Sequence, residues 1–97
     1  MITSRANSHV KAARALGSAK ERKQTGLFLD EGEDALGAAL AAGIAPVEAF
    51  VDDDLGSDRV AQELAAAGAR VLRCSAGVMA ALSALAHPSR AVGVLRA

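Results

Sequence analysis

The sequence predicts a small α/β domain in which helices cover a largely parallel central sheet. Short apolar runs of strand length alternate along the chain with alanine-rich segments of helix length. Glycine or proline residues stand at most of the boundaries between these segments. The 97 residues include 25 Ile, Leu, Val, Met and Phe residues, which are enough for one small core. Alternation at this spacing implies right-handed crossovers, and therefore strands that run in the same direction.

The first 25 residues are the most polar part of the chain, and we expect them to form a basic, partly mobile arm. Ser8 is expected to cap a helix that continues through Leu16 and stops at Gly17. Residues 1–25 hold six basic residues and one acidic residue, a net charge of +5, whereas residues 26–97 carry a net charge of −5. Nucleic-acid binding depends on such a local patch rather than on the neutral total. A solvated basic helix without a partner is the alternative interpretation.

The segments after the arm predict two strands with a helix between them. Residues 25–31, TGLFLDE, form a short apolar run that is typical of a strand buried on both faces. Residues 33–43 place alanine and leucine along one stripe and stop at a glycine, as expected of a helix. Residues 47–52, VEAFVD, follow a proline and predict the second strand. The two phenylalanines of the chain, Phe28 and Phe50, fall in these strands and are expected to be buried.

The second half of the chain repeats this alternation. Residues 57–68 predict a helix capped by Ser57, because a serine hydroxyl can accept a hydrogen bond from a first-turn N–H. Residues 70–75 predict a third strand, and residues 75–86 predict a third amphipathic helix that ends before a proline. Residues 91–96, AVGVLR, predict the closing strand. The order is therefore helix, three strand–helix units and a final strand.

The sequence lacks the usual signatures of catalysis, nucleotide binding and metal binding. It contains neither GxGxxG nor GxxxxGK[ST], and it pairs no serine with a base. His9 and His87 lack the spacing of metal ligands, so we predict no metal site. The acidic run at residues 52–54 is expected to be a solvated turn where a strand ends. Because the chain has no Trp or Tyr and both phenylalanines are expected inside strands, a stacking platform for single-stranded RNA is not expected.

The single cysteine, Cys74, excludes an intramolecular disulfide and fits a reducing cytoplasm. It lies in an apolar stretch, so a packed thiol is expected rather than a nucleophile. The N-terminus lacks the pattern of a signal peptide, and no apolar stretch approaches the length of a membrane helix. These observations favour a cytoplasmic protein without a membrane partner.

Two motifs stand close together in the first third of the chain. The first has the pattern Ser-x-x-Asn-x-x-[Val/Ile]-Lys and consists of Ser4, Asn7, Val10 and Lys11. The second has an Arg ahead of Gly-x-Phe-x-x-Glu-Gly and consists of Arg22, Gly26, Phe28, Glu31 and Gly32. With the later stretches VMAALS and VGVLRA, their order and spacing resemble the N-terminal domain of the SpoU/TrmH family of RNA 2′-O-ribose methyltransferases. The chain departs from that family at residues 88–90, which read Pro-Ser-Arg where the family often has Pro-Gln-Gly.

The resemblance implies a three-layer α/β/α sandwich with a small, mostly parallel sheet, like that of the ribosomal proteins that bind kink-turn RNA. In family members this domain recognises RNA, and a separate knotted domain binds S-adenosylmethionine and transfers the methyl group. The motifs of that catalytic domain contain asparagine, whereas the only asparagine of this chain is Asn7. We therefore expect one RNA-binding domain over residues 1–97, without catalytic residues or a cofactor, either cut from a methyltransferase parent or as a stand-alone relative. The domain alone is expected to be a monomer, and the parent a homodimer.

The expected RNA-binding residues lie in the basic arm and in the turn after the first strand. Basic side chains would supply phosphate contacts, and a glycine would let the backbone near a helix N-terminus approach RNA. These residues are Arg5, Asn7, Lys11, Arg14, Arg22, Lys23, Glu31 and Gly32. A cap or a structural hydrogen bond is the alternative role for Glu31. The expected partner is structured rRNA or tRNA; the alternatives are a free-standing kink-turn-type or ribosome-associated RNA-binding protein, or a protein-interaction domain.

Overall fold

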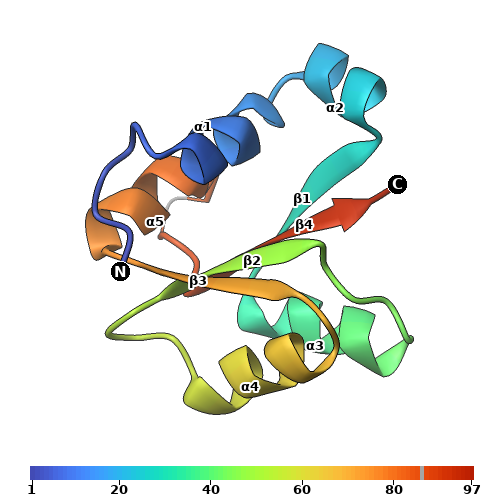
Figure 1. Cartoon of the computed structure of the whole chain (residues 1–97), viewed down its shortest axis with the longest axis vertical. Coiled ribbons are helices and arrows are strands. Elements are labelled where there is room, and N and C mark those ends of the chain that lie inside the picture. Colours follow the sequence, from blue (N-terminus) through green and yellow to red (C-terminus); the bar gives the residue numbers. More distant parts are fainter. Residues whose placement is uncertain (86) are drawn as a thin grey trace.

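Helices cover both faces of a four-stranded sheet. The computed structural model describes residues 1–85 and 87–97. The elements are, in chain order, α1 (Ser8–Ala15), α2 (Ala19–Thr25), β1 (Leu27–Glu31), α3 (Glu33–Ala41), β2 (Glu48–Asp52), α4 (Asp58–Ala66), β3 (Arg70–Cys74), α5 (Ala76–Leu82) and β4 (Ala91–Arg96). Figure 1 shows α1 and α5 on one side of the sheet and α3 and α4 on the other. The α/β/α sandwich expected from the sequence is therefore confirmed.

The sheet has the strand order β1-β4-β2-β3 and mixed strand directions. β2 and β3 are parallel, but β4 is antiparallel to both of its neighbours, β1 and β2. The prediction of a mostly parallel sheet is wrong in this respect. An apolar strand pattern does not encode direction. β4 begins with Ala91 beside Val51, near the end of β2, and runs back along β2 from there. As a consequence, one end of the sheet holds the C-terminal ends of β1, β2 and β3 together with the start of β4.

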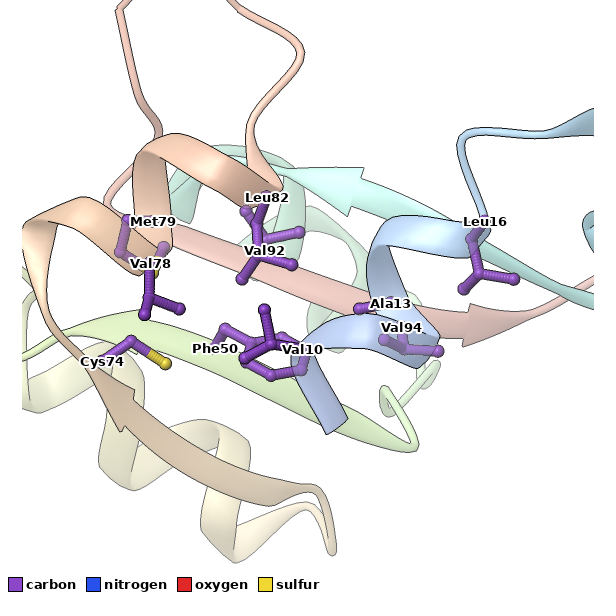
Figure 2. Close-up of a cluster of buried hydrophobic side chains, with 10 residues drawn as sticks. All are labelled: Val10, Ala13, Leu16, Phe50, Cys74, Val78, Met79, Leu82, Val92 and Val94. Atoms are coloured by element: carbon purple, nitrogen blue, oxygen red, sulfur yellow. The ribbon is translucent and has the colours of Figure 1, made fainter. Parts of the chain in front are cut away.

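Two apolar clusters hold the layers together, one on each face of the sheet. Figure 2 shows the first, in which Phe50 of β2 lies among side chains from α1, α5 and β4. The second packs Leu36 of α3 and Leu64 of α4 against the opposite face. All three side chains are 0% exposed. Burial of such a side chain contributes about 1.5–3 kcal/mol, so these clusters fix the helices against the sheet.

β1 is an edge strand, and this position changes the environment of Phe28. The strand pairs only with β4, and its Leu27 and Leu29 face the cluster beneath α1 and α5. Side chains alternate along a strand, so Phe28 faces the other side, where it remains 36% exposed. The prediction of a strand buried on both faces, with Phe28 inside, is therefore wrong. Phe50, on the interior strand β2, is buried as predicted.

Polar caps begin three of the helices. Asn7, rather than Ser8 as predicted, caps α1: its Oδ1 accepts hydrogen bonds from the N–H groups of His9 and Val10. Asparagine and serine are similarly good caps, so sequence preference alone did not distinguish adjacent positions. Ser57 caps α4 as predicted, and its Oγ accepts from the N–H of Val60. Ser75 caps α5 in the same way.

α2 lies where the sequence analysis expected a partly mobile arm. Its sequence, AKERKQT, contains good helix formers but no apolar stripe, and none of its residues is buried. The helix ends at Gly26, which has a φ of +69° that favours glycine. α2 packs beside β1, at the edge of the sheet (Figure 1). The missing apolar stripe explains why periodicity did not reveal this helix.

The third amphipathic helix is shorter than predicted. α5 ends at Leu82, and Ser83 already has extended backbone angles. Leu85, which the longer helix would have included, is 58% exposed. Residue 86, the last of the predicted helix, lies outside the described residues. Because the helix ends early, Ser83 and Ala84 can bond to Glu31 at the end of β1.

Candidate nucleic-acid interface

A cavity of about 650 Å³ opens between α1, α2, β1 and the end of α5. Two arginines, one on α1 and one on α2, border it together with the carboxylate that ends β1. The lining residues are Arg14, Leu16, Gly17, Arg22, Phe28, Leu29, Glu31, Ala81, Leu82, Ser83 and Ala84. Three of the residues expected from the sequence, Arg14, Arg22 and Glu31, therefore meet at one concave surface. They come from three separate elements, which the core packing brings together.

Arg22 has a structural role at this cavity. Its Nη1 donates hydrogen bonds to the carbonyl oxygens of Leu16, at 2.9 Å, and Gly17, at 3.0 Å. These carbonyls follow the last turn of α1, where helix geometry leaves acceptors without intrahelical donors. The contact fixes α2 against the end of α1 and holds the guanidinium at the cavity. Since a guanidinium carries five N–H donors, others remain for a ligand.

Glu31 joins β1 to the segment that follows α5. Its Oε1 accepts hydrogen bonds from the hydroxyls of Ser83, at 2.6 Å, and Ser89, at 3.1 Å. Its Oε2 accepts from the backbone N–H of Ala84 at 3.0 Å. The structural alternative considered for Glu31 is therefore realised, because the carboxylate at the end of β1 binds Ser83, Ala84 and Ser89.

Gly32 begins α3 in a conformation that suits glycine. Its φ is +105°, and no atom lies within 4 Å of the position that a Cβ would take. A second hollow, of about 480 Å³, is lined here by Glu31, Gly32, Arg90 and the first turn of α3. The backbone at this turn is therefore open to solvent on the side where a Cβ would lie. Glu31 borders both hollows, so they are neighbours.

The remaining expected residues do not line the larger cavity. Asn7 uses its side-chain oxygen to cap α1. Arg5 lies in the turn before α1, Lys11 is exposed on α1, and Lys23 is exposed on α2. These three cations belong to the basic first 25 residues but do not border the cavity. Lys20 is likewise exposed on α2.

Sequence reasoning missed several residues that shape the site. Ser83 and Ser89 hold Glu31, and Arg90 borders the second hollow. Ser89 and Arg90 fall within the stretch 88–90, where the chain departs from the pattern of the family it resembles. The unusual sequence at 88–90 could therefore have drawn attention to Ser89 and Arg90. Ser83 carried no comparable signal, because only the folded chain brings it to Glu31, 52 positions away.

Other polar groups of the fold have structural partners. The Nδ1 of His9 on α1 lies 3.1 Å from Oε2 of Glu48 on β2. The turn predicted at this acidic run is confirmed for Asp53 and Asp54, which are exposed. Asp52, by contrast, ends β2 and is buried rather than solvated, and its Oδ1 accepts from the N–H groups of Asp54 and Leu55. Within residues 1–85 and 87–97, no cluster of three or more His, Cys, Asp or Glu residues could hold a metal ion.

Cys74 is packed in the core, as predicted. The side chain is 0% exposed, and its Sγ lies 3.4 Å from the carbonyl oxygen of Leu72. Burial, with a smaller contribution from nearby Asp52, raises the pKa of the thiol from 9.0 to about 11. A thiol with a raised pKa is a poor nucleophile at neutral pH.

None of the helices within the described residues has the length and apolar character of a membrane span.

Comparison with known families identifies one match. Residues 7–93 match the profile of the MRM3-like substrate binding domain. This match includes α1, α2 and β1 in full, and it reaches into β4. No match was found among curated protein sequences.

Three solved structures share the fold. An RNA 2′-O ribose methyltransferase is 33% identical, with a TM-score of 0.81 over 98% of this chain. An rRNA methyltransferase from Sinorhizobium meliloti is 28% identical, with a TM-score of 0.84 over 99%. The SpoU methyltransferase AviRb from Streptomyces viridochromogenes, in complex with AdoMet, is 20% identical over 93%, with a TM-score of 0.76. The chain spans 36%, 36% and 35% of their respective lengths, about one third of each.

Proposed function

Because the chain belongs to the MRM3-like substrate binding domain family, we propose that it is the RNA-recognition domain of a SpoU/TrmH-like 2′-O-ribose methyltransferase that acts on rRNA or tRNA. The resemblance to the SpoU/TrmH family that the two sequence motifs suggested is confirmed by these comparisons. The proposed ligand is structured RNA. The proposed contact surface consists of α1, α2 and the turn at Glu31 and Gly32.

The proposal rests mainly on one observation. Arg14 and Arg22 border a cavity that lies on the most basic part of the chain, and Glu31 fixes the far wall of that cavity. Lys11 on α1 and Lys20 and Lys23 on α2 are exposed, so the two helices that border the cavity carry further positive charge. Arginine and lysine side chains bind phosphate and release counterions from RNA, so a surface of this composition favours an RNA backbone.

The methyl-transfer step is assigned to a separate domain of the parent protein. AviRb and an AdoMet-bound rRNA methyltransferase from Sinorhizobium meliloti are both described with this cofactor, and this chain covers 35% of each of those proteins. We assign recognition to this domain and chemistry to its parent, and we expect the domain alone to be monomeric.

The test is a titration of the domain with a structured RNA hairpin at several salt concentrations. Fluorescence anisotropy of a labelled hairpin should show saturable binding that weakens steeply as salt rises. The log–log slope should be about −0.7 to −0.9 for each phosphate that the protein neutralises. Absence of binding at low salt would contradict the proposal and would favour a protein-interaction domain.

A further inference from the structure

We infer that the cavity between α1, α2, β1 and α5 holds one unpaired nucleotide of the RNA, with the base inside and the phosphate at the arginines. This inference rests on the proposed function and adds to it the form of RNA that the site selects. The volume of about 650 Å³ lies in the range of small-molecule sites, about 300–1,000 Å³. A base that is paired and stacked in a duplex cannot enter such a cavity, whereas an unpaired base can be turned into it.

The walls offer the two kinds of surface that a nucleotide requires. Phe28 and Leu29 supply partly exposed apolar contact for a base, whereas Leu16 and Leu82 line the cavity but are each only 4% exposed. Arg14 and Arg22 stand at the α1 and α2 side, where a guanidinium can bind a phosphate or stack on a base. Arg22 is held there by two backbone carbonyls, at 2.9 and 3.0 Å, so less side-chain freedom is lost when a ligand binds.

The open edge of β1 adds backbone groups that can recognise a base. The N–H of Gly32 donates to the carbonyl oxygen of Ala91, and the carbonyl oxygen of Gly26 accepts from the N–H of Ala97. Along β1, therefore, the backbone groups of the even-numbered residues are the ones that bond to β4. In an antiparallel pair this alternation directs the N–H and C=O of Leu29 away from β4. Phe28 faces the other side of the sheet yet also lines the cavity, which shows that the cavity reaches this edge.

The one carboxylate at the cavity does not repel the proposed ligand strongly. Both oxygens of Glu31 already accept hydrogen bonds, from Ser83, Ser89 and Ala84. These donors partly offset the negative charge at the α5 wall. The positive groups are on the opposite wall, at the ends of α1 and α2. The arrangement therefore orients a nucleotide with its phosphate toward the arginines.

A cavity-filling substitution tests the inference. Ala81 lines the cavity from α5, and Ala81→Leu adds volume while keeping a good helix former. Ala80→Leu is the matched control, because Ala80 is the adjacent α5 residue, is exposed and does not line the cavity. The probes are RNA hairpins with one stem sequence and a randomised loop, and a fully paired duplex of equal length.

Wild-type protein should bind the hairpins more tightly than the duplex. Ala81→Leu should weaken hairpin binding about tenfold and leave duplex binding unchanged, and Ala80→Leu should change neither. A thermal melt of each variant checks that the fold is kept. The inference would be overturned if wild-type protein bound hairpin and duplex equally, or if folded Ala81→Leu kept its hairpin affinity. Neither result would contradict the proposed RNA recognition.

A second measurement needs no protein variant. Abasic nucleotides are placed at one loop position at a time, and wild-type affinity is measured for each hairpin. Loss of one base should weaken binding about tenfold at one position or two adjacent positions. If no loop base affects affinity, the cavity does not hold a base. If wild-type protein binds none of these RNAs at low salt, the proposed function fails together with this inference.

Discussion

The hydroxyl of Ser83 donates a hydrogen bond of 2.6 Å to Glu31, and this contact joins the end of β1 to the segment after α5 across 52 positions of the chain. Ser89 and the backbone of Ala84 bond to the same carboxylate. One side chain thus sets the shape of the α5 wall of the cavity and of the neighbouring hollow at Gly32. The site depends on a contact between segments distant in sequence.

Replacing Glu31 by alanine should loosen Ser83, Ala84 and Ser89. The change removes three hydrogen bonds to a partly exposed carboxylate, so we expect the free energy of unfolding to fall by about 2 kcal/mol. Urea denaturation measures the change. Asp30→Ala is the matched control, because Asp30 is the adjacent carboxylate on the opposite side of the strand. Equal stability of the two variants would show that the hydrogen bonds to Glu31 contribute nothing.

The two phenylalanines should differ strongly in their contribution to stability. Phe50 is 0% exposed in the first core cluster, so Phe50→Ala should cost about 3–5 kcal/mol. Phe28 is 36% exposed on the edge strand, so Phe28→Ala should cost about 1–2 kcal/mol. The sequence alone, which placed Phe28 in a buried strand, predicted a cost of about 3–5 kcal/mol for Phe28→Ala as well. Denaturant midpoints of the two variants compare them directly, and a Phe28→Ala cost as large as that of Phe50→Ala would contradict the exposed position.

The buried thiol of Cys74 should make stability fall at alkaline pH. Burial raises its pKa from 9.0 to about 11, so between these values the unfolded chain has lost the proton that the folded chain keeps. Unfolding is then favoured increasingly as pH rises from about 9 to about 11. Urea midpoints across this range should decline more for wild-type protein than for Cys74→Ala. Parallel declines would show that the thiol does not contribute.

The domain alone should not bind AdoMet. The similar structures that are described with AdoMet are about three times the length of this chain, and we assign the cofactor to their remaining part. Calorimetric titration of the domain with AdoMet should give no saturable heat. Saturable binding would contradict the division of labour that we propose between this domain and its parent.

The sequence predicted the layered fold because apolar runs of distinct length mark strands and helices. It did not predict the direction of β4, since an apolar run reads the same in both directions. It missed α2, which is held by Arg22 and by contact with β1 rather than by an apolar stripe. It placed Phe28 inside the core, because burial at a sheet edge depends on which strands become neighbours.

The candidate site was predicted in part. Arg22, Glu31 and Gly32 came from the motif that resembles the SpoU/TrmH family, and Arg14 came from the charge pattern. The structure brings Arg14, Arg22 and Glu31 to one cavity. Ser83 could not be predicted, because its role arises only when α5 ends early and the chain turns back toward β1.

The central claim is that the arginines at the cavity bind RNA phosphates. The variant Arg14→Gln/Arg22→Gln removes both charges and keeps a hydrogen-bond donor at each position. Its matched control is Arg59→Gln/Arg70→Gln, which removes two exposed charges from α4 and from the start of β3, at the other edge of the sheet. Thermal melts confirm that both variants are folded before binding is compared.

The decisive measurement is the slope of log affinity against log salt for a structured RNA hairpin. For Arg14→Gln/Arg22→Gln we predict weaker binding at low salt and a slope that is shallower by about 1.5 units, because two phosphate contacts are lost. The Arg59→Gln/Arg70→Gln control should keep the wild-type slope. If the folded cavity variant keeps both the affinity and the slope of the wild-type protein, the arginines are only part of a solvated surface and the proposed interface is wrong.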